Sequence, residues 1–111
     1  MSLHLFSKKI KKQFKNIIMT LKEIAKDSST RFVDVRSEME FNMGHVKGAV
    51  NIPLDQFQQR YEEIKGLGDT PVVFYCRSGN RSGQAVGYLR KMGIDNIYNG
   101  GALEDLEYYL N

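Results

Sequence analysis

One cysteine stands where a sulfur nucleophile would be useful. Cys76 ends an apolar run at residues 72–76, and the polar sequence Arg-Ser-Gly-Asn-Arg-Ser follows it before a helical pattern is established. Backbone N–H groups in such a turn can surround an anion, and the positive end of the next helix strengthens their field. The same field favours thiolate over thiol and lowers the cysteine pKa from about 8.5. The spacing therefore predicts a nucleophilic sulfur that faces an anionic substrate.

The alternative for this cysteine is structural, because a lone cysteine at the end of an apolar strand is commonly a small buried hydrophobe. Two arginines within the next five residues favour the functional interpretation, since a structural cysteine has no use for them. Gly79 would also allow a positive φ inside the turn. We therefore take Cys76 as the candidate catalytic residue. The candidate substrate-binding residues follow it: Arg77, Ser78, Gly79, Asn80, Arg81 and Ser82.

Few other residues are candidates for chemistry. The two histidines, His4 and His45, are far apart in the sequence, so with one cysteine they predict no metal site, and we expect no cofactor. We predict that His45 is a hydrogen-bonded packing residue rather than a group that titrates in function. Arg36 has the spacing to pair with Glu40 on a helix.

The elements that would position the cysteine alternate along the chain. Short runs of mostly apolar residues predict strands at 14–19, 32–35, 49–52, 72–76 and 96–98. Helical spacing predicts helices at 21–27, 38–43, 54–64, 82–92 and 103–110, with Gly100 and Gly101 breaking the last strand. This alternation predicts an α/β fold with a parallel sheet covered on both faces. Ligands of such sheets bind beyond the carboxyl ends of the strands, where Cys76 stands.

Length and composition indicate a single small domain. The chain has 111 residues, of which 41% are apolar and 26% charged, which is enough for one core and too little for two domains. One cysteine cannot form an internal disulfide. No apolar run approaches the roughly 20 residues of a membrane-spanning helix. The first residues also lack the apolar stretch of a signal peptide, so we predict a cytoplasmic protein.

The positive charge is concentrated at the beginning of the chain. Residues 1–22 contain six lysines and no acidic residue, whereas the remainder carries a net negative charge. Such a segment could bind nucleic acid or an anionic membrane. A solvated lysine face is the simpler interpretation, and we predict neither partner. We assign residues 1–13 to a basic tail and residues 14–111 to the domain.

Several stretches together resemble the rhodanese family of thiosulfate sulfurtransferases. They are DVR at 34–36, EF at 40–41, GHVKGAVNIP at 44–53, YCRSGNRS at 75–82 and GGALEDL at 100–106. They occur in the order and at the spacing of that family. Because Asp34 and Arg36 match one of these motifs, we predict that they make structural ties near the edge of the site. The resemblance implies a single domain with a five-stranded parallel sheet and helices on both faces, which agrees with the pattern of elements above.

The resemblance also implies a reaction. Cys76 would accept sulfur from thiosulfate or a similar anionic donor, become a persulfide, and pass the sulfur to a nucleophilic acceptor such as cyanide or a thiol, including a protein thiol. Two alternatives remain open. The domain could carry sulfur or bind a protein without turnover. It could also be a cysteine phosphatase or arsenate reductase, although related phosphatases have arginine six positions after the cysteine, where this chain has Ser82.

Overall fold

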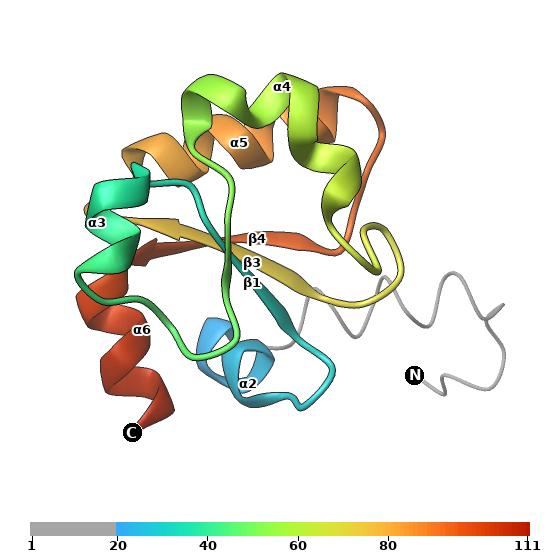
Figure 1. The fold of residues 1–111 in the computed structure, drawn as a ribbon. Helices are drawn as coiled ribbons and strands as arrows, with labels where there is room; N and C mark the ends of the chain where they lie inside the picture. The colour runs from blue at the N-terminus through green and yellow to red at the C-terminus, as the bar shows by residue number, and fades with distance from the viewer. Residues whose placement is uncertain (1–19) are drawn as a thin grey trace, which may run out of the picture.

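The computed structural model describes residues 20–111, and Figure 1 shows a sheet between two layers of helices. The strands run in the order β2-β1-β3-β4, and each neighbouring pair is parallel. They are β1 Arg31–Asp34, β2 Val50–Asn51, β3 Val72–Cys76 and β4 Ile97–Ala102. The helices are α2 Leu21–Lys26, α3 Glu38–Asn42, α4 Phe57–Arg60, α5 Asn80–Lys91 and α6 Leu103–Leu110, with short 3-10 turns η2 Leu54–Gln56 and η3 Tyr61–Glu63.

The interior strand β3 fixes the position of the site. All five of its residues are buried, and it pairs with β1 on one side and β4 on the other. Alternate side chains of a strand face opposite sides of the sheet. Phe74 and Cys76 join the core under α4 and α5, whereas Val73 and Tyr75 join the core under α2 and α6. Figure 1 shows these two helical layers on opposite sides of the strands.

These features confirm the predicted parallel α/β fold with helices on both faces. The strand predicted at 14–19 and the tail at 1–13 lie outside the described residues, so four strands of the expected sheet are seen. The helix predicted at 54–64 is divided into η2, α4 and η3. The strand predicted at 49–52 keeps only Val50–Asn51, next to Pro53, which cannot donate a ladder hydrogen bond.

Two predicted boundaries near the cysteine were wrong. Helix α5 begins at Asn80, two residues before the predicted start, because Gly79 takes a left-handed conformation and ends the turn there. Strand β4 extends to Ala102 and passes through Gly100 and Gly101, which were predicted to break it. A Cβ on Gly100 would lie 2.6 Å from Val73 Cγ1, so the glycine allows β4 to pack closely against β3. The pairing changes register between Phe74 and Tyr75, where this close packing occurs.

Candidate active site

Cys76 is the last residue of β3 and lies at the carboxyl edge of the sheet, before α5. Its side chain is fully buried. The backbone N–H of Gly79 donates to Sγ at 3.0 Å, and the hydroxyl oxygen of Ser82 lies 3.4 Å from Sγ. The turn after the cysteine is therefore folded back over the sulfur, as an anion-binding turn would be.

This environment favours the thiolate. Burial by itself raises the pKa of the Cys76 thiol, because a buried charge loses its hydration. The hydroxyl and backbone N–H of Ser82 act in the opposite direction, and so do the backbone N–H groups of Ser78 and Gly79. Together these hydrogen bonds outweigh burial, and the pKa of Cys76 lies below its ordinary value. A cysteine with a lowered pKa is a better nucleophile near neutral pH.

Gly79 is required by the shape of the turn. Its φ is +96°, a region that residues with a side chain rarely adopt. A Cβ at this position would also lie 3.2 Å from the Cα of Gly101 in β4. The glycine therefore lets the turn lie against β4 while its N–H points at the sulfur.

The remaining predicted site residues are brought to the same turn with different orientations. Ser78 reaches the sulfur through its backbone, and its side chain is exposed. The side-chain oxygen of Asn80 accepts a hydrogen bond from Gln84 at 3.1 Å on the exposed surface of α5. Ser82 is buried and faces both the sulfur and β4. The structure thus places the side chain of Ser82 at the sulfur and that of Asn80 away from it.

Arg77 and Arg81 lie in contrasting surroundings. Arg77 is exposed and lines a groove of about 550 Å³ whose other walls include Met43, just after α3, and Glu104 from α6. Arg81 instead binds Glu40 of α3 through two hydrogen bonds, at 2.8 and 3.1 Å. This contact is the main reason that the pKa of Glu40 is lowered to about 2.

The sequence analysis did not predict the contacts that two residues, Glu40 and Asn99, make at this site. Glu40 was expected to pair with Arg36, but it pairs with Arg81, and Arg36 pairs with Asp34. Asn99 of β4 bonds to both Gly79 and Ser82 and was not singled out at all. No local pattern marks either contact, because the partners are 17 to 41 residues apart in the sequence.

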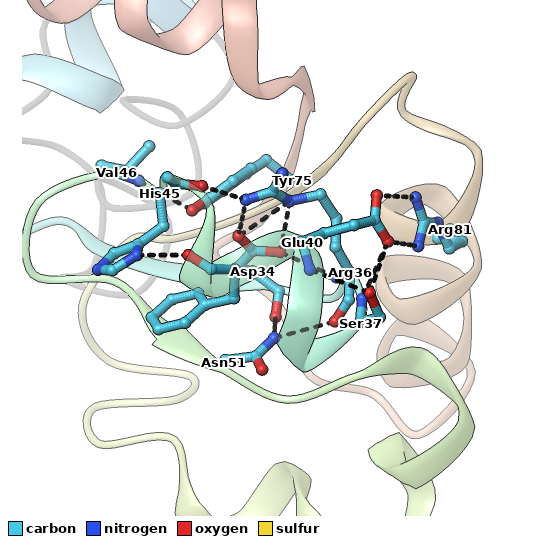
Figure 2. A network of polar contacts seen from close by, with 11 residues as sticks. Asp34, Arg36, Ser37, Glu40, His45, Val46, Asn51, Tyr75 and Arg81 are labelled. Atoms are coloured by element: carbon cyan, nitrogen blue, oxygen red, sulfur yellow. Dashed lines mark hydrogen bonds and ion pairs between the residues drawn. The ribbon is translucent and has the colours of Figure 1, made fainter.

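Asp34 and Arg36 form a buried ion pair, whose contacts are drawn in Figure 2. The carboxylate of Asp34 accepts hydrogen bonds from the guanidinium of Arg36, the shortest at 2.7 Å, and from its backbone N–H. Arg36 also donates to the carbonyl of Gly44 at 2.6 Å. The Tyr75 hydroxyl accepts from the N–H of Val46 at 3.0 Å. These bonds tie the segment between β1 and β2 to β3 and confirm that Asp34 and Arg36 are structural ties.

His45 is hydrogen-bonded, as predicted, although its side chain is exposed rather than packed in the core. Its Nδ1 lies 2.8 Å from the carbonyl oxygen of Phe41, and its ring stacks on the Phe41 ring with the centroids 3.7 Å apart. Figure 2 shows His45 directed away from Arg81. Among residues 20–111, no three His, Cys, Asp or Glu side chains are grouped closely enough to hold a metal ion. No helix in that same range is long and apolar enough to cross a membrane.

Comparisons with known proteins agree with this geometry. A model of the rhodanese-like domain matches residues 18–104. The thiosulfate sulfurtransferase PspE of Escherichia coli is 34% identical over 79 residues, which cover 71% of this chain and 76% of PspE. A solved structure described as a rhodanese with anions from E. coli superposes with a TM-score of 0.63 at 36% identity, covering 68% of this chain and 89% of that one.

A third similar protein is YqhL of Bacillus subtilis, which is uncharacterized. It is 49% identical over 69 residues, or 62% of this chain, and the match spans about half of YqhL, 53% of its length. One relative of moderate identity, PspE, is thus a thiosulfate sulfurtransferase, and the domain model covers most of the chain. This protein belongs to the family of rhodanese-like domains.

Proposed function

We propose that the protein is a sulfurtransferase that moves sulfane sulfur from thiosulfate or a similar anionic donor to a nucleophilic acceptor through a persulfide on Cys76. The observation that carries the proposal is the turn over the sulfur. A buried Sγ accepts the N–H of Gly79 at 3.0 Å and lies 3.4 Å from the Ser82 hydroxyl. The similarity to PspE, a thiosulfate sulfurtransferase, supports the same reaction.

The first half-reaction loads the sulfur. The Cys76 thiolate attacks the outer sulfur of thiosulfate, an S–S bond forms to Sγ, and the bond between the two donor sulfurs breaks. Sulfite leaves with that electron pair, and Cys76 holds the persulfide, whose negative charge lies on the outer sulfur. No general base is needed, because the lowered pKa of Cys76 already favours the thiolate.

The second half-reaction removes the sulfur. Cyanide or a thiolate, including one on a protein, attacks the outer sulfur, and the S–S bond to Sγ breaks with its electron pair returning to Cys76. Each half-reaction is a two-electron displacement that consumes no cofactor. A reducing compartment such as the cytoplasm keeps the single cysteine available for this cycle.

The turn supplies the binding groups that this cycle needs. We assign the backbone N–H groups of Ser78, Gly79 and Ser82 to the anionic sulfur, on the contacts that lower the pKa of Cys76. Arg77 is assigned to the donor anion, because it lines the groove and has no ion-pair partner within residues 20–111. Because Cys76 has no exposed surface, the donor reaches Sγ only after the groups that cover it move.

A phosphatase is less compatible with the same contacts. The sixth position after the cysteine is Ser82, which is turned inward between Sγ and Asn99. Arg81, at the fifth position, is held by both oxygens of Glu40. Neither residue offers the free guanidinium that a bound phosphate would require.

The test is the intact mass of the protein after incubation with thiosulfate, and again after cyanide. We expect a gain of one sulfur atom that cyanide removes and that the Cys76→Ser variant does not show. Loading without catalytic turnover would indicate a sulfur carrier instead. No loading from thiosulfate or another sulfane donor, with hydrolysis of an aryl phosphate, would replace this proposal by the phosphatase.

A further inference from the structure

The side chain of Asn99 in β4 forms hydrogen bonds with the turn after Cys76, with the start of α5 and with its own strand. Its Nδ2 donates to the carbonyl of Gly79 at 3.0 Å. Its Oδ1 accepts from the Ser82 hydroxyl at 2.7 Å and from the Gly101 N–H at 2.9 Å. Gly79 in the turn and Ser82 in the first turn of α5 are also the two residues that contact Sγ.

These contacts fix the orientation of the amide. If the amide were rotated by half a turn, its NH₂ group would face the Gly101 N–H and its oxygen would face the Gly79 carbonyl, so both contacts would become repulsive. Oδ1 therefore always faces the hydroxyl of Ser82. An acceptor is held beside that hydroxyl at a constant position.

The hydroxyl of Ser82 has a single hydrogen and two candidate acceptors. One is Oδ1 of Asn99 at 2.7 Å, and the other is Sγ at 3.4 Å. When the sulfur is a thiol, S–H can donate to Oγ while Ser82 donates to Asn99, and every group is satisfied. When the sulfur is a thiolate, the hydrogen of Ser82 is drawn to the negative charge, because hydrogen bonds to ions are the stronger ones.

We infer that Asn99 is a positioning residue of the sulfur site: it holds the turn through Gly79 and accepts the hydroxyl hydrogen of Ser82 whenever Sγ is uncharged. Only the orientation of the hydroxyl changes, and the serine keeps its proton throughout. Under the proposed function, Sγ is also uncharged in the persulfide, because the charge then lies on the outer sulfur. Loading would thus return the Ser82 hydrogen to Asn99.

Charged groups near the cysteine remain the same in the test below. Arg81 from α5 interacts electrostatically with Cys76, and Glu40 from α3 is its partner. Arg77 directly follows the cysteine in the chain. Asp34 at the end of β1 and Arg36, two residues later, form another ion pair. None of them bonds to Asn99, so a substitution there leaves this charge arrangement in place.

The decisive variant is Asn99→Asp. It loses the donor to Gly79, keeps a stronger acceptor for Ser82 and adds a negative charge, and all three changes disfavour the thiolate. Because Asn99 is exposed, solvent screening limits the effect, and we expect the pKa of Cys76 to rise by about 0.5 to 1. Ultraviolet absorbance of the thiolate against pH measures this directly, since the chain has one cysteine.

A matched control, Asn96, lies directly before the same strand. Asn96 also donates through Nδ2 to a carbonyl, that of Asp69 at 3.0 Å, and accepts a hydroxyl hydrogen, that of Tyr98 at 2.8 Å. Asn96→Asp therefore makes the same chemical change away from the sulfur. We expect it to lower thermal stability and leave the pKa of Cys76 unchanged. Equal pKa values in the Asn99→Asp, Asn96→Asp and unmodified proteins would overturn the inference.

The role of the Ser82 hydroxyl is tested by combining substitutions at Asn99 and Ser82. In a Ser82→Ala background, Asn99→Asp should raise the pKa of Cys76 by about half as much or less, because the hydroxyl between them is gone. An equal rise in both backgrounds would show that Asn99 acts by charge alone. These titrations use no sulfur donor, so their outcome is separate from success or failure of the proposed sulfur transfer.

A measurement on the unmodified protein avoids variants that fail to fold. The NMR signals of the Asn99 side-chain amide and the Gly101 N–H should move together as Cys76 titrates, while that of the Asn96 side chain stays fixed. The movement should vanish in Cys76→Ser. An Asn99 signal that does not respond to the titration would overturn the inference.

Discussion

The turn after Cys76 has an arginine near each end, and the two are held very differently. Arg77 is exposed, lines the groove beside α6 and makes no ion pair within residues 20–111. Arg81 is bound to both carboxylate oxygens of Glu40, with contacts of 2.8 and 3.1 Å. Figure 2 shows that this pair continues through Glu40 to Ser37, the residue that caps α3.

The difference shows that two identical side chains within one motif need not share a role. The charge of Arg81 is compensated by Glu40, and its contact joins the first turn of α5 to α3. Arg77 makes no ion pair within residues 20–111 and faces a groove large enough for a small anion, which Glu104 and Glu107 also line. We therefore propose that Arg77 binds the donor, whereas Arg81 acts mainly by holding α3 against the turn.

The largest expected effect comes from Arg77→Ala. Loss of a charged hydrogen-bond donor to thiosulfate should lower kcat/KM for the donor by about 10- to 100-fold. The rate of sulfur removal by a thiol that carries no other ionised group and the melting temperature should change little. Single-turnover measurements of both half-reactions check this, with Arg77→Lys as the variant that keeps the charge. Equal losses in the two half-reactions would contradict the assignment of Arg77 to the donor.

A smaller effect, mainly on stability, is expected from Arg81→Ala. The side chains of Arg81 and Glu40 are about one-third exposed, at 35% and 30%. After allowance for solvent screening, loss of the pair should lower the free energy of unfolding by about 1 kcal/mol. Denaturant unfolding of Arg81→Ala, Glu40→Gln and the double variant measures the coupling. If Arg81→Ala instead kept its stability and lost donor binding as strongly as Arg77→Ala, the two arginines would have the same role.

The pair of Arg81 and Glu40 should also have a signature in acid. The hydrogen bond from Arg81 is the largest cause that lowers the pKa of Glu40, to about 2 in the folded protein against 4.5 ordinarily. A lowered folded-state pKa gives stability that is fully present above about pH 4.5 and is lost as the pH falls toward 2. Between pH 6 and about pH 3, the unmodified protein should therefore lose more stability than Arg81→Ala.

The exposed pair of Arg60 and Glu63 provides the control for this acid effect. It has a similar N–O distance of 3.0 Å, but the Glu63 side chain is 57% exposed. Arg60→Ala should leave the acid dependence nearly as it is in the unmodified protein. An unfolding curve for Arg81→Ala that stays parallel to that of the unmodified protein across this pH range would show that Glu40 contributes no such stability.

Local pattern was sufficient to predict much of the fold around the cysteine. The apolar run that ends at Cys76 is β3 as predicted, and helix and strand alternate through the described chain. These features depend on burial, which leaves a periodic mark on the sequence. Boundaries were less predictable where a glycine decides them. Gly79 starts α5 early through its positive φ, and Gly100 continues β4 by allowing close packing.

Partners within the site were harder to predict than the site itself. The motif placed Cys76 and its turn together because they are adjacent in the chain. Which carboxylate binds Arg81, and which side chain holds Ser82, depends on how α3 and β4 pack against that turn. Several acidic and amide residues have suitable chemistry, and one sequence offers no means of choosing among them.

The smallest effect is expected from removing residues 1–12. We propose that the domain comprises residues 14–111, and that the preceding lysines do not serve the site. The deletion removes four of the six lysines in residues 1–22, so it would slow thiosulfate binding if general attraction, rather than Arg77, brought in the anion. We expect kcat/KM for thiosulfate to change by less than about twofold at physiological ionic strength, where the screening length is about 8 Å.

A large loss at low salt that disappears at high salt would assign the attraction to the lysines. A loss independent of salt would mean that the domain needs this segment. Either result would contradict the proposal that the lysines before the domain do not serve the site.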